Sequence, residues 1–316
     1  GINEKLRGHF EANAGTFFGN QQLRRDAAAV FTVAGVPSRR TEDYKYLQLD
    51  TLLKKDFGFR TALMRGVTSD DVEKLALVPG AILLVIVNGT FVPGLSKTAD
   101  LPAGLTIESI ADATETNPVA KQHYGKYTAG SSDAMIALNT MLAASGVFIH
   151  VHKKAVIETP VHLIHIADNE TASVFNPRNL LVAEEGSQFT LIESFESIGP
   201  VKSFTNALIE VFVGANTIVD HYRIQAEGEQ GHLVSSVQSN ISRSSNYTTH
   251  TYTFGGSLVR NNLNNILAEP GTETHLFGLY LPKGNQVFDN HTIVDHTVPN
   301  CMSNELYKGV VTDKGT

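Results

Sequence analysis

The chain has 316 residues, of which 42% are hydrophobic, with a net charge of −7 and a single cysteine. This length is enough for one large domain or for a core with a smaller partner domain. The negative charge argues against binding to nucleic acid, and the longest apolar run, residues 81–87, is too short to span a membrane. One cysteine excludes an internal disulfide framework, indicates a reducing cytoplasm, and cannot alone supply the thiolates of a four-cysteine iron–sulfur site.

The first part of the chain is predicted to be helical. Apolar residues recur with helical spacing in Gln21–Ala34, and Gly35 is a natural stop. Thr41 is a candidate cap for a second helix that would continue past residue 50. Two further helical segments are predicted over residues 70–77 and 132–144.

From residue 80 the pattern changes from helices to strands. The run AILLVIVNGTFV predicts a hairpin that turns at Asn88–Gly89. After residue 146 helical periodicity nearly disappears, and short β-rich runs follow one another between turn residues. We therefore divide the chain into an N-terminal helical region (1–79), a mixed α/β connecting region (80–145) and a β core (146–316).

The β core carries a weak internal repeat. Three segments consist of an apolar run, a turn with glycine and a second apolar run, and their glycines are Gly186, Gly214 and Gly271. The gaps between these glycines are 28 and 57 residues, so the second is about twice the first. A repeat in the twenties without helices is typical of a β-solenoid. A β-sandwich would also give short strands, and only the repeat argues against it.

The pentapeptide TIVDH occurs twice, at Thr217–His221 and Thr292–His296. Histidines within and between the copies are spaced by 29, 25 and 21 residues: His221, His250, His275 and His296. We predict that the two copies are the same strand of a solenoid, three coils apart. Their terminal histidines would then point to the same side, which we expect to be the outside.

The second copy lies in a stretch with four possible metal ligands: His291, Asp295, His296 and Cys301. Its β-branched residues predict a strand, in which His291 and Asp295 lie about 13 Å apart and cannot share one metal. His296 and Cys301 can approach only around the turn at Pro299–Asn300. We therefore retain His291, His296 and Cys301 as metal candidates only if a neighbouring coil or another subunit contributes, and all four residues as interface candidates. A polar strand face, with a buried structural thiol at Cys301, is the simpler interpretation.

Other functional motifs are weaker or missing. There is no Walker A sequence and no GxGxxG. His150 and His152, followed by Glu158 and much later by His291, faintly resemble the two metal motifs of a cupin, although the spacing to Glu158 is too long. A cupin-like metal-dependent enzyme using His150, His152 and His291 stays as the alternative function. A carbohydrate-active β-helix is disfavoured by the lack of tryptophan and by scattered acidic residues.

Two stretches resemble a known family. They are GVPSRRTEDYKYL (35–47) and RNNLNNILAEPGTETHLFGLYLPKGNQVFDNHTIVDHTVPNCMSNELYKGVV (260–311). Together they resemble the SufD branch of the SufB/SufD family of iron–sulfur cluster assembly proteins. The second stretch is long and specific, with the pattern HTxVDHxxPxCxSNxxYKG. Residues 50–259 agree with the family in their general sequence character rather than in specific motifs.

The resemblance implies a fold and partners. The fold is a helical N-terminal region followed by a right-handed parallel β-helix, and the partners are the paralogue SufB and the ABC-type ATPase SufC. The implied role is a non-catalytic scaffold in the cytoplasm, with ATP hydrolysis left to SufC. An iron–sulfur cluster would be held only transiently in the complex, so we expect no cofactor in the isolated chain, for which a homodimer is one alternative.

The resemblance also has a limit. Members of the family continue with further coils, a C-terminal helical segment that docks SufC, and a Cys-Ser-His-Gly motif at the cluster-forming interface. This chain stops at Thr316 without these features. We therefore expect a truncated chain and carry none of those residues over to it.

Overall fold

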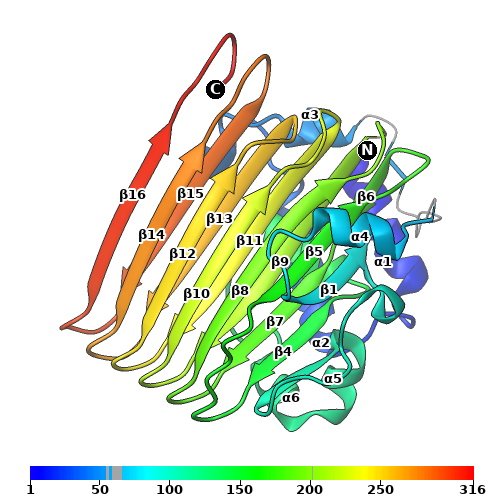
Figure 1. The fold of residues 1–316 in the computed structure, drawn as a ribbon. Helices are drawn as coiled ribbons and strands as arrows, with labels where there is room; N and C mark the ends of the chain where they lie inside the picture. Colours follow the sequence, from blue (N-terminus) through cyan, green and yellow to red (C-terminus); the bar gives the residue numbers. More distant parts are fainter. Residues whose placement is uncertain (55–56, 59–65, 201) are drawn as a thin grey trace.

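The computed structural model describes residues 1–54, 57–58, 66–200 and 202–316 (Figure 1). The chain alternates between two parallel sheets, so that two successive strands make one coil of a β-solenoid of about six turns. Helices from the N-terminal part of the chain gather on one end of this solenoid (Figure 1). The predicted parallel β-helix with an N-terminal helical region is confirmed.

Each sheet is built from every second strand. Sheet 1 contains, in spatial order, β16 (Met302–Gly309), β14 (Glu273–Tyr280), β12 (Asn246–Thr253), β10 (Ile218–Gln225), β8 (Gln188–Ser197), β5 (Val161–Ala167), β1 (Ile82–Val87) and β2 (Thr90–Phe91). Sheet 2 contains β15 (Val287–His296), β13 (Leu258–Leu267), β11 (Gly231–Ile241), β9 (Ser203–Val213), β7 (Arg178–Ala183), β4 (Val147–Val151) and β3 (Leu105–Ser109), with β6 (Ser173–Phe175) beside β9. Among the described strands, the β1–β2 and β3–β4 pairs are antiparallel and the others are parallel.

Neighbouring coils are offset by about 28 residues, a normal length for a solenoid repeat. Ile218 of β10, for example, pairs with Gln188 of β8 and with Asn246 of β12. The average of 25 residues taken from the histidine spacing is too short. The histidines do not share one column of equivalent positions, since His250 pairs with Tyr222.

The two TIVDH copies are not equivalent. His221 lies on β10 of sheet 1 and is fully buried inside the solenoid, whereas His296 ends β15 of sheet 2 and is exposed. The prediction that both copies form the same strand, with their histidines pointing outward on one side, is therefore wrong. Alternate residues of this pentapeptide point to opposite sides of the strand, and each side carries one apolar and one polar residue. The pentapeptide can therefore lie in either sheet, with either side facing the interior of the solenoid.

The glycine repeat reflects a real structural repeat at the corner before each strand of sheet 1. At the corners before β8, β10, β12, β14 and β16 one residue has a positive φ, which favours glycine and asparagine. Gly186 and Gly271 hold this position, whereas Gly214 lies two residues before the equivalent residue, Asn216. The residues with positive φ at these corners are Gly186, Asn216, Ser244, Gly271 and Asn300.

Local signals determine the ends of the N-terminal elements. In α2 (Gln21–Ala34) the side chain of Asn20 accepts hydrogen bonds from the first turn, and the helix stops at Gly35 with φ of 64°, as predicted. The predicted hairpin is also confirmed, because Asn88 and Gly89 both have positive φ between β1 and β2. Thr41 starts only a 3₁₀ turn, η1 (Glu42–Tyr44), and the following helix begins later. The other short elements are α1 (Ile2–Asn13), α3 (Leu49–Leu53), α4 (Ser69–Leu75), η2 (Pro93–Leu95), α5 (Ile110–Thr116), α6 (Pro118–His123) and α7 (Ala134–Leu142).

The helices cover different parts of the solenoid surface. The apolar faces of α1, α2 and α7 form one core with the outer face of sheet 2, where they meet Phe204 of β9 and Val234 of β11. Helix α4 packs Val72 on the outer face of sheet 1 at β1 and β5. Because β1 pairs in parallel with β5, residues of the connecting region take part in sheet 1. The three-part division of the chain stays a prediction.

Candidate functional sites

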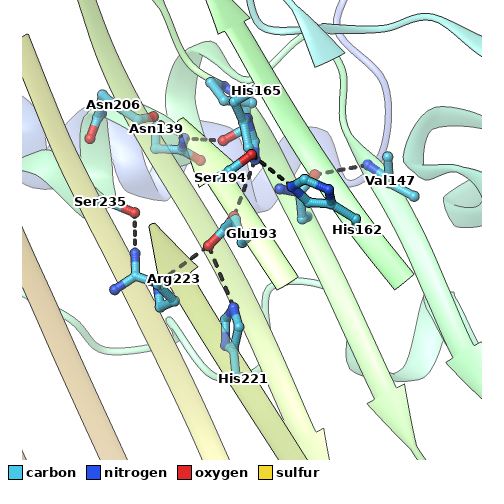
Figure 2. Close-up of polar contacts among 12 residues, drawn as sticks. Asn139, Val147, His162, His165, Glu193, Ser194, Asn206, His221, Arg223 and Ser235 are labelled. Carbon is cyan, nitrogen blue, oxygen red and sulfur yellow. Dashed lines mark hydrogen bonds and ion pairs between the residues drawn. The ribbon is translucent and has the colours of Figure 1, made fainter. Parts of the chain in front are cut away.

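Four ionisable side chains meet inside the solenoid (Figure 2). Glu193 and Arg223 are register partners on β8 and β10, so their side chains are neighbours in one inward-facing column. The Oε2 atom of Glu193 lies 3.3 Å from Nε of Arg223 and 3.6 Å from Nε2 of His221. On the other side, Oε1 of Glu193 lies 3.2 Å from Nε2 of His165 on β5. All four side chains are at least 95% buried.

Hydrogen bonds determine the protonation of this interior cluster. Because Nε2 of His221 faces a carboxylate, it carries the proton, and Nδ1 accepts from the hydroxyl of Tyr247 at 2.9 Å. Burial alone would raise the pKa of Glu193, but hydrogen bonds from His165 and His221 and the charge of Arg223 hold it well below its usual value. Burial lowers the pKa of His221. The cluster therefore contains a carboxylate, a guanidinium and a neutral His221 at neutral pH.

Polar groups continue away from the carboxylate. Arg223 donates through Nη2 to the hydroxyl of Ser235 on β11, which joins the two sheets (Figure 2). Arg223 Nη1 and the hydroxyls of Thr249 and Thr251 are buried without a hydrogen-bond partner in the protein. Such groups need water or another small polar molecule to be stable. The middle of the solenoid is thus a polar interior between apolar corners.

This cluster was not predicted from the sequence. His221 was predicted to face outward, and Glu193, Arg223 and His165 were not singled out. A usable signal was present, since Glu193 and Arg223 are opposite charges 30 positions apart, close to one coil. This spacing indicates a contact between neighbouring strands only when the coil length is known.

The two stretches that carry the family resemblance meet at a second site. The hydroxyl of Tyr44 donates to Oδ2 of Asp133 at 2.7 Å and accepts from Nδ2 of Asn262 at 3.2 Å. The guanidinium of Arg260 lies over the Tyr44 ring, 4.7 Å from its centre, and pairs with Asp289. Burial, followed by the charge of Asp133, raises the pKa of Tyr44, so its hydroxyl stays a donor. This junction fastens the N-terminal region to the outer face of sheet 2.

Replacing Tyr44 by phenylalanine is expected to lower the free energy of unfolding by about 1 to 3 kcal/mol, because Asp133 and Asn262 lose a buried partner. Urea unfolding followed by circular dichroism measures the change. Tyr46→Phe is the matched control, since Tyr46 is 76% exposed and should change stability little. Equal stability of the two variants would contradict a role for the junction.

The four candidate residues of the C-terminal stretch are spread over different surfaces. His291 lies 3.8 Å from Asp43 beside the junction, and Asp295 is exposed farther along β15. His296 contacts the hydroxyl of Ser303 at 3.0 Å. Within the described ranges, no three His, Cys, Asp or Glu side chains are grouped to hold a metal. A metal or interface role for these residues stays a prediction that requires a second chain.

Cys301 occupies a repeated corner position. Its thiol is half-buried and lies 3.4 Å from the carbonyl oxygen of Glu269, to which it donates. The residues just before β8, β10, β12 and β14 each carry a hydroxyl that bonds to a corner carbonyl in the same way. These residues are Ser187, Thr217, Ser245 and Thr272. The thiol thus replaces a structural hydroxyl, which supports the simpler interpretation of this cysteine.

The cupin-like grouping is wrong. His150 lies on β4 and His291 on β15, which are five strand spacings apart in sheet 2, or about 24 Å. His150 is instead stacked on His152 at 4.4 Å and lies 3.4 Å from Glu184. The histidines that the alternative function required therefore cannot bind one metal within this chain.

Both halves of the chain match known family models. Residues 11–163 match the SufBD protein N-terminal region, and residues 165–316 match the SufBD core domain of the SUF system for FeS cluster assembly. The chain belongs to the SufBD family. The boundary between the two matches falls within β5, where the parallel solenoid is already under way.

Curated SufBD relatives agree along most of the chain. The iron–sulfur cluster assembly protein SufD of Escherichia coli is 27% identical over 284 residues, covering 89% of this chain and 64% of that protein. A SufBD family protein of Synechocystis is 28% identical over 304 residues, covering 92% and 66%. The chloroplastic protein ABCI7 of Arabidopsis thaliana is 24% identical over 322 residues, covering 98% and 66%. The chain thus spans somewhat less than two thirds of the length of these relatives.

No helix in the described part of the chain is both long enough and apolar enough to cross a bilayer.

Proposed function

We propose that this chain is a non-catalytic scaffold subunit of the Suf iron–sulfur cluster assembly machinery. It works in the cytoplasm with SufB and the ATPase SufC, in cluster formation or iron delivery. The match of both halves of the chain, in order, to the two SufBD regions carries the proposal. In this role ATP hydrolysis is left to SufC, and the chain contributes surfaces rather than a reaction centre.

The amino-acid chemistry supports a shared site. An ordinary cluster needs about four thiolate or equivalent ligands, and this sequence has Cys301 as its one cysteine. A cluster held with this chain would therefore take most of its ligands from a partner. His291, Asp295, His296 and Cys301 are the residues we propose for the contact with SufB.

Complex formation tests the proposal. Co-expressed with SufB and SufC, the chain is expected to co-elute with both in size-exclusion chromatography as one stable species. The reference is the same preparation with SufB and SufC alone. Elution of the chain apart from both partners, at concentrations where SufB and SufC remain together, would count against a scaffold role.

The isolated chain is expected to bind far less than one iron–sulfur cluster per chain after reconstitution with iron and sulfide under reducing conditions. One thiolate cannot complete the ligand set. Iron quantification and visible absorbance measure the occupancy, and Cys301→Ser gives the background from adventitious iron. Near one cluster per monomeric chain, lost in Cys301→Ser, would refute the shared-ligand proposal.

A further inference from the structure

Helices α2 and α7 leave an open groove beside the loop that joins α6 to α7. The volume of this groove is about 720 Å³. One side of α2 lines it over about 17 Å, because the apolar residues that face it recur at helical spacing. These residues are Leu23, Ala27, Val30 and Ala34. Val33 at the rim is 90% exposed, so the described part of the chain leaves this end uncovered. We call this hollow the α2 groove.

The α2 groove continues into a polar pocket beside the Tyr44 junction. This pocket has a volume of about 350 Å³ and extends as far as Asn264 of β13 and His291 of β15. Ile293, which is 48% exposed, forms an apolar lip at its far side. The two hollows are continuous, since the same residues line both where they meet. These shared residues are Ala34, Gly130, Ser131, Ser132 and Ile136.

The polar pocket presents hydrogen-bond acceptors. The Oδ1 atom of Asn264 is buried and has no hydrogen-bond partner among the described residues. Asp133 accepts hydrogen bonds from Tyr44 and from the first turn of α7, and it turns its carboxylate towards the same pocket. The side chain of Asp43 is 69% exposed and lies 3.8 Å from His291. Because a buried acceptor is stable only beside a donor, this end suits a ligand that brings N–H groups.

The charges around the two hollows are mostly negative. Among the described residues that line them, Asp26, Asp43 and Asp133 are acidic, and Arg260 is the residue with a permanent positive charge. The guanidinium of Arg260 is 3% exposed and is already paired with Asp289. The acidic side chains therefore dominate the potential in the groove, which favours a ligand with positive charge.

We propose that the α2 groove and the polar pocket together bind a basic amphipathic helix of a partner protein. Its apolar side chains lie along α2, where the small residues Ala27 and Ala34 let a helix approach closely. Its lysine or arginine side chains reach the polar pocket, donate to Asn264 and lie beside Asp43. The inference goes beyond the scaffold role, since it shares only His291 with the contact proposed for SufB.

Binding of a synthetic peptide to the purified chain tests the proposal. The probe is a fluorescently labelled helical peptide of about 18 residues, or about 27 Å, made of leucine, alanine and lysine with the lysines at one end. Fluorescence anisotropy is expected to show saturable binding with a dissociation constant of about 1 to 100 μM, weakening as salt is added. Absence of saturable binding up to about 1 mM of the chain would overturn the proposal.

Substitutions at the rim locate the bound peptide. Val33→Lys is expected to weaken binding at least about tenfold, because it removes an apolar contact and repels the lysines of the peptide. The fold should tolerate this change, since Val33 is 90% exposed. Val156→Lys is the matched control, because Val156 is 56% exposed at a solenoid corner that lines neither hollow. Equal affinity of the two variants would place the peptide elsewhere and refute the proposal.

A charge exchange tests the polar end. Asp43→Lys should weaken binding of the lysine peptide, and a second peptide with glutamates in place of the lysines should bind this variant more tightly than it binds the wild type. Asp112→Lys is the control, because Asp112 is exposed on α5 and lines neither hollow. If the wild type binds both peptides equally, the groove does not select a basic partner and the proposal is wrong. These measurements use the chain without SufB or SufC, so they stand or fall independently of the scaffold role.

Discussion

Replacing Arg223 by methionine is expected to lower the free energy of unfolding by about 3 to 5 kcal/mol. Methionine fills a similar volume, so the main change is that the fully buried carboxylate of Glu193 loses its cation. The ring nitrogens of His165 and His221 still lie 3.2 and 3.6 Å from this carboxylate, but they do not replace the charge of the guanidinium. The penalty is the cost of an uncompensated buried charge rather than the value of the ion pair itself.

A second substitution separates these two quantities. Glu193→Gln removes the charge and keeps an oxygen that accepts from His165, so the double variant with Arg223→Met is expected to regain most of the lost stability. Arg243→Met is the control, because Arg243 is exposed at a corner and should change stability by less than about 0.5 kcal/mol. Chemical unfolding measures all four proteins. Equal losses in the single and double variants would show that the cost is a packing defect.

The parts of the fold that depend on near neighbours could be predicted from the sequence. Helix α2 has its cap at Asn20 and its stop at Gly35, and the β1–β2 turn has Asn88 and Gly89, so the deciding residues lie within the elements themselves. The solenoid followed from a repeat of turn residues, because each coil needs a residue with positive φ at the same corner. Its exact length did not follow, since the glycines and histidines used to measure it are not all equivalent.

The interior cluster could not be predicted, because the register of strand pairing decides which side chains point into the solenoid. A shift of one residue exchanges the inner and outer faces of a strand. Both faces of β10 carry a mixture of polar and apolar residues, so its sequence does not show which face is buried. His221 was therefore assigned to the outside, although it is fully buried. The junction was missed for another reason. The resemblance indicated both the stretch with Tyr44 and the stretch with Arg260, but nothing in either sequence shows that the two side chains touch.

A buried acid near the interior cluster provides a second large effect. Glu227 lies in the loop between β10 and β11, is 4% exposed, and has one carboxyl oxygen without a hydrogen-bond partner. It lines a small cavity together with Glu196, His165 and Thr205. Burial, followed by the nearby charge of Glu196, raises the pKa of Glu227 to about 8. Burial raises the pKa of Glu196 to about 7.

The sign of the pH dependence follows from these shifts. Between the ordinary pKa of 4.5 and the raised value of about 8, Glu227 binds a proton in the folded chain and has lost it in the unfolded chain. The folded state therefore binds more protons, and the free energy of unfolding falls as the pH rises through this window. Below pH 4.5 Glu227 makes its full contribution to the free energy of unfolding. As the pH rises this contribution falls by about 1.4 kcal/mol per pH unit or less, and it is lost by about pH 8.

Glu227→Gln is therefore expected to flatten the pH profile of stability. Relative to the wild type, the variant should gain about 2 to 4 kcal/mol between pH 5 and pH 9, because the amide cannot ionise in the cavity. Urea unfolding at pH 5, 7 and 9 measures this difference, and comparing each protein with itself across pH cancels any packing change that does not depend on pH. Glu229→Gln is the matched control, since Glu229 is exposed in the same loop and its removal should leave the profile parallel to that of the wild type. If the Glu227→Gln profile also runs parallel to the wild type, the carboxyl group is not held protonated in the folded chain, and the loop must let it reach water.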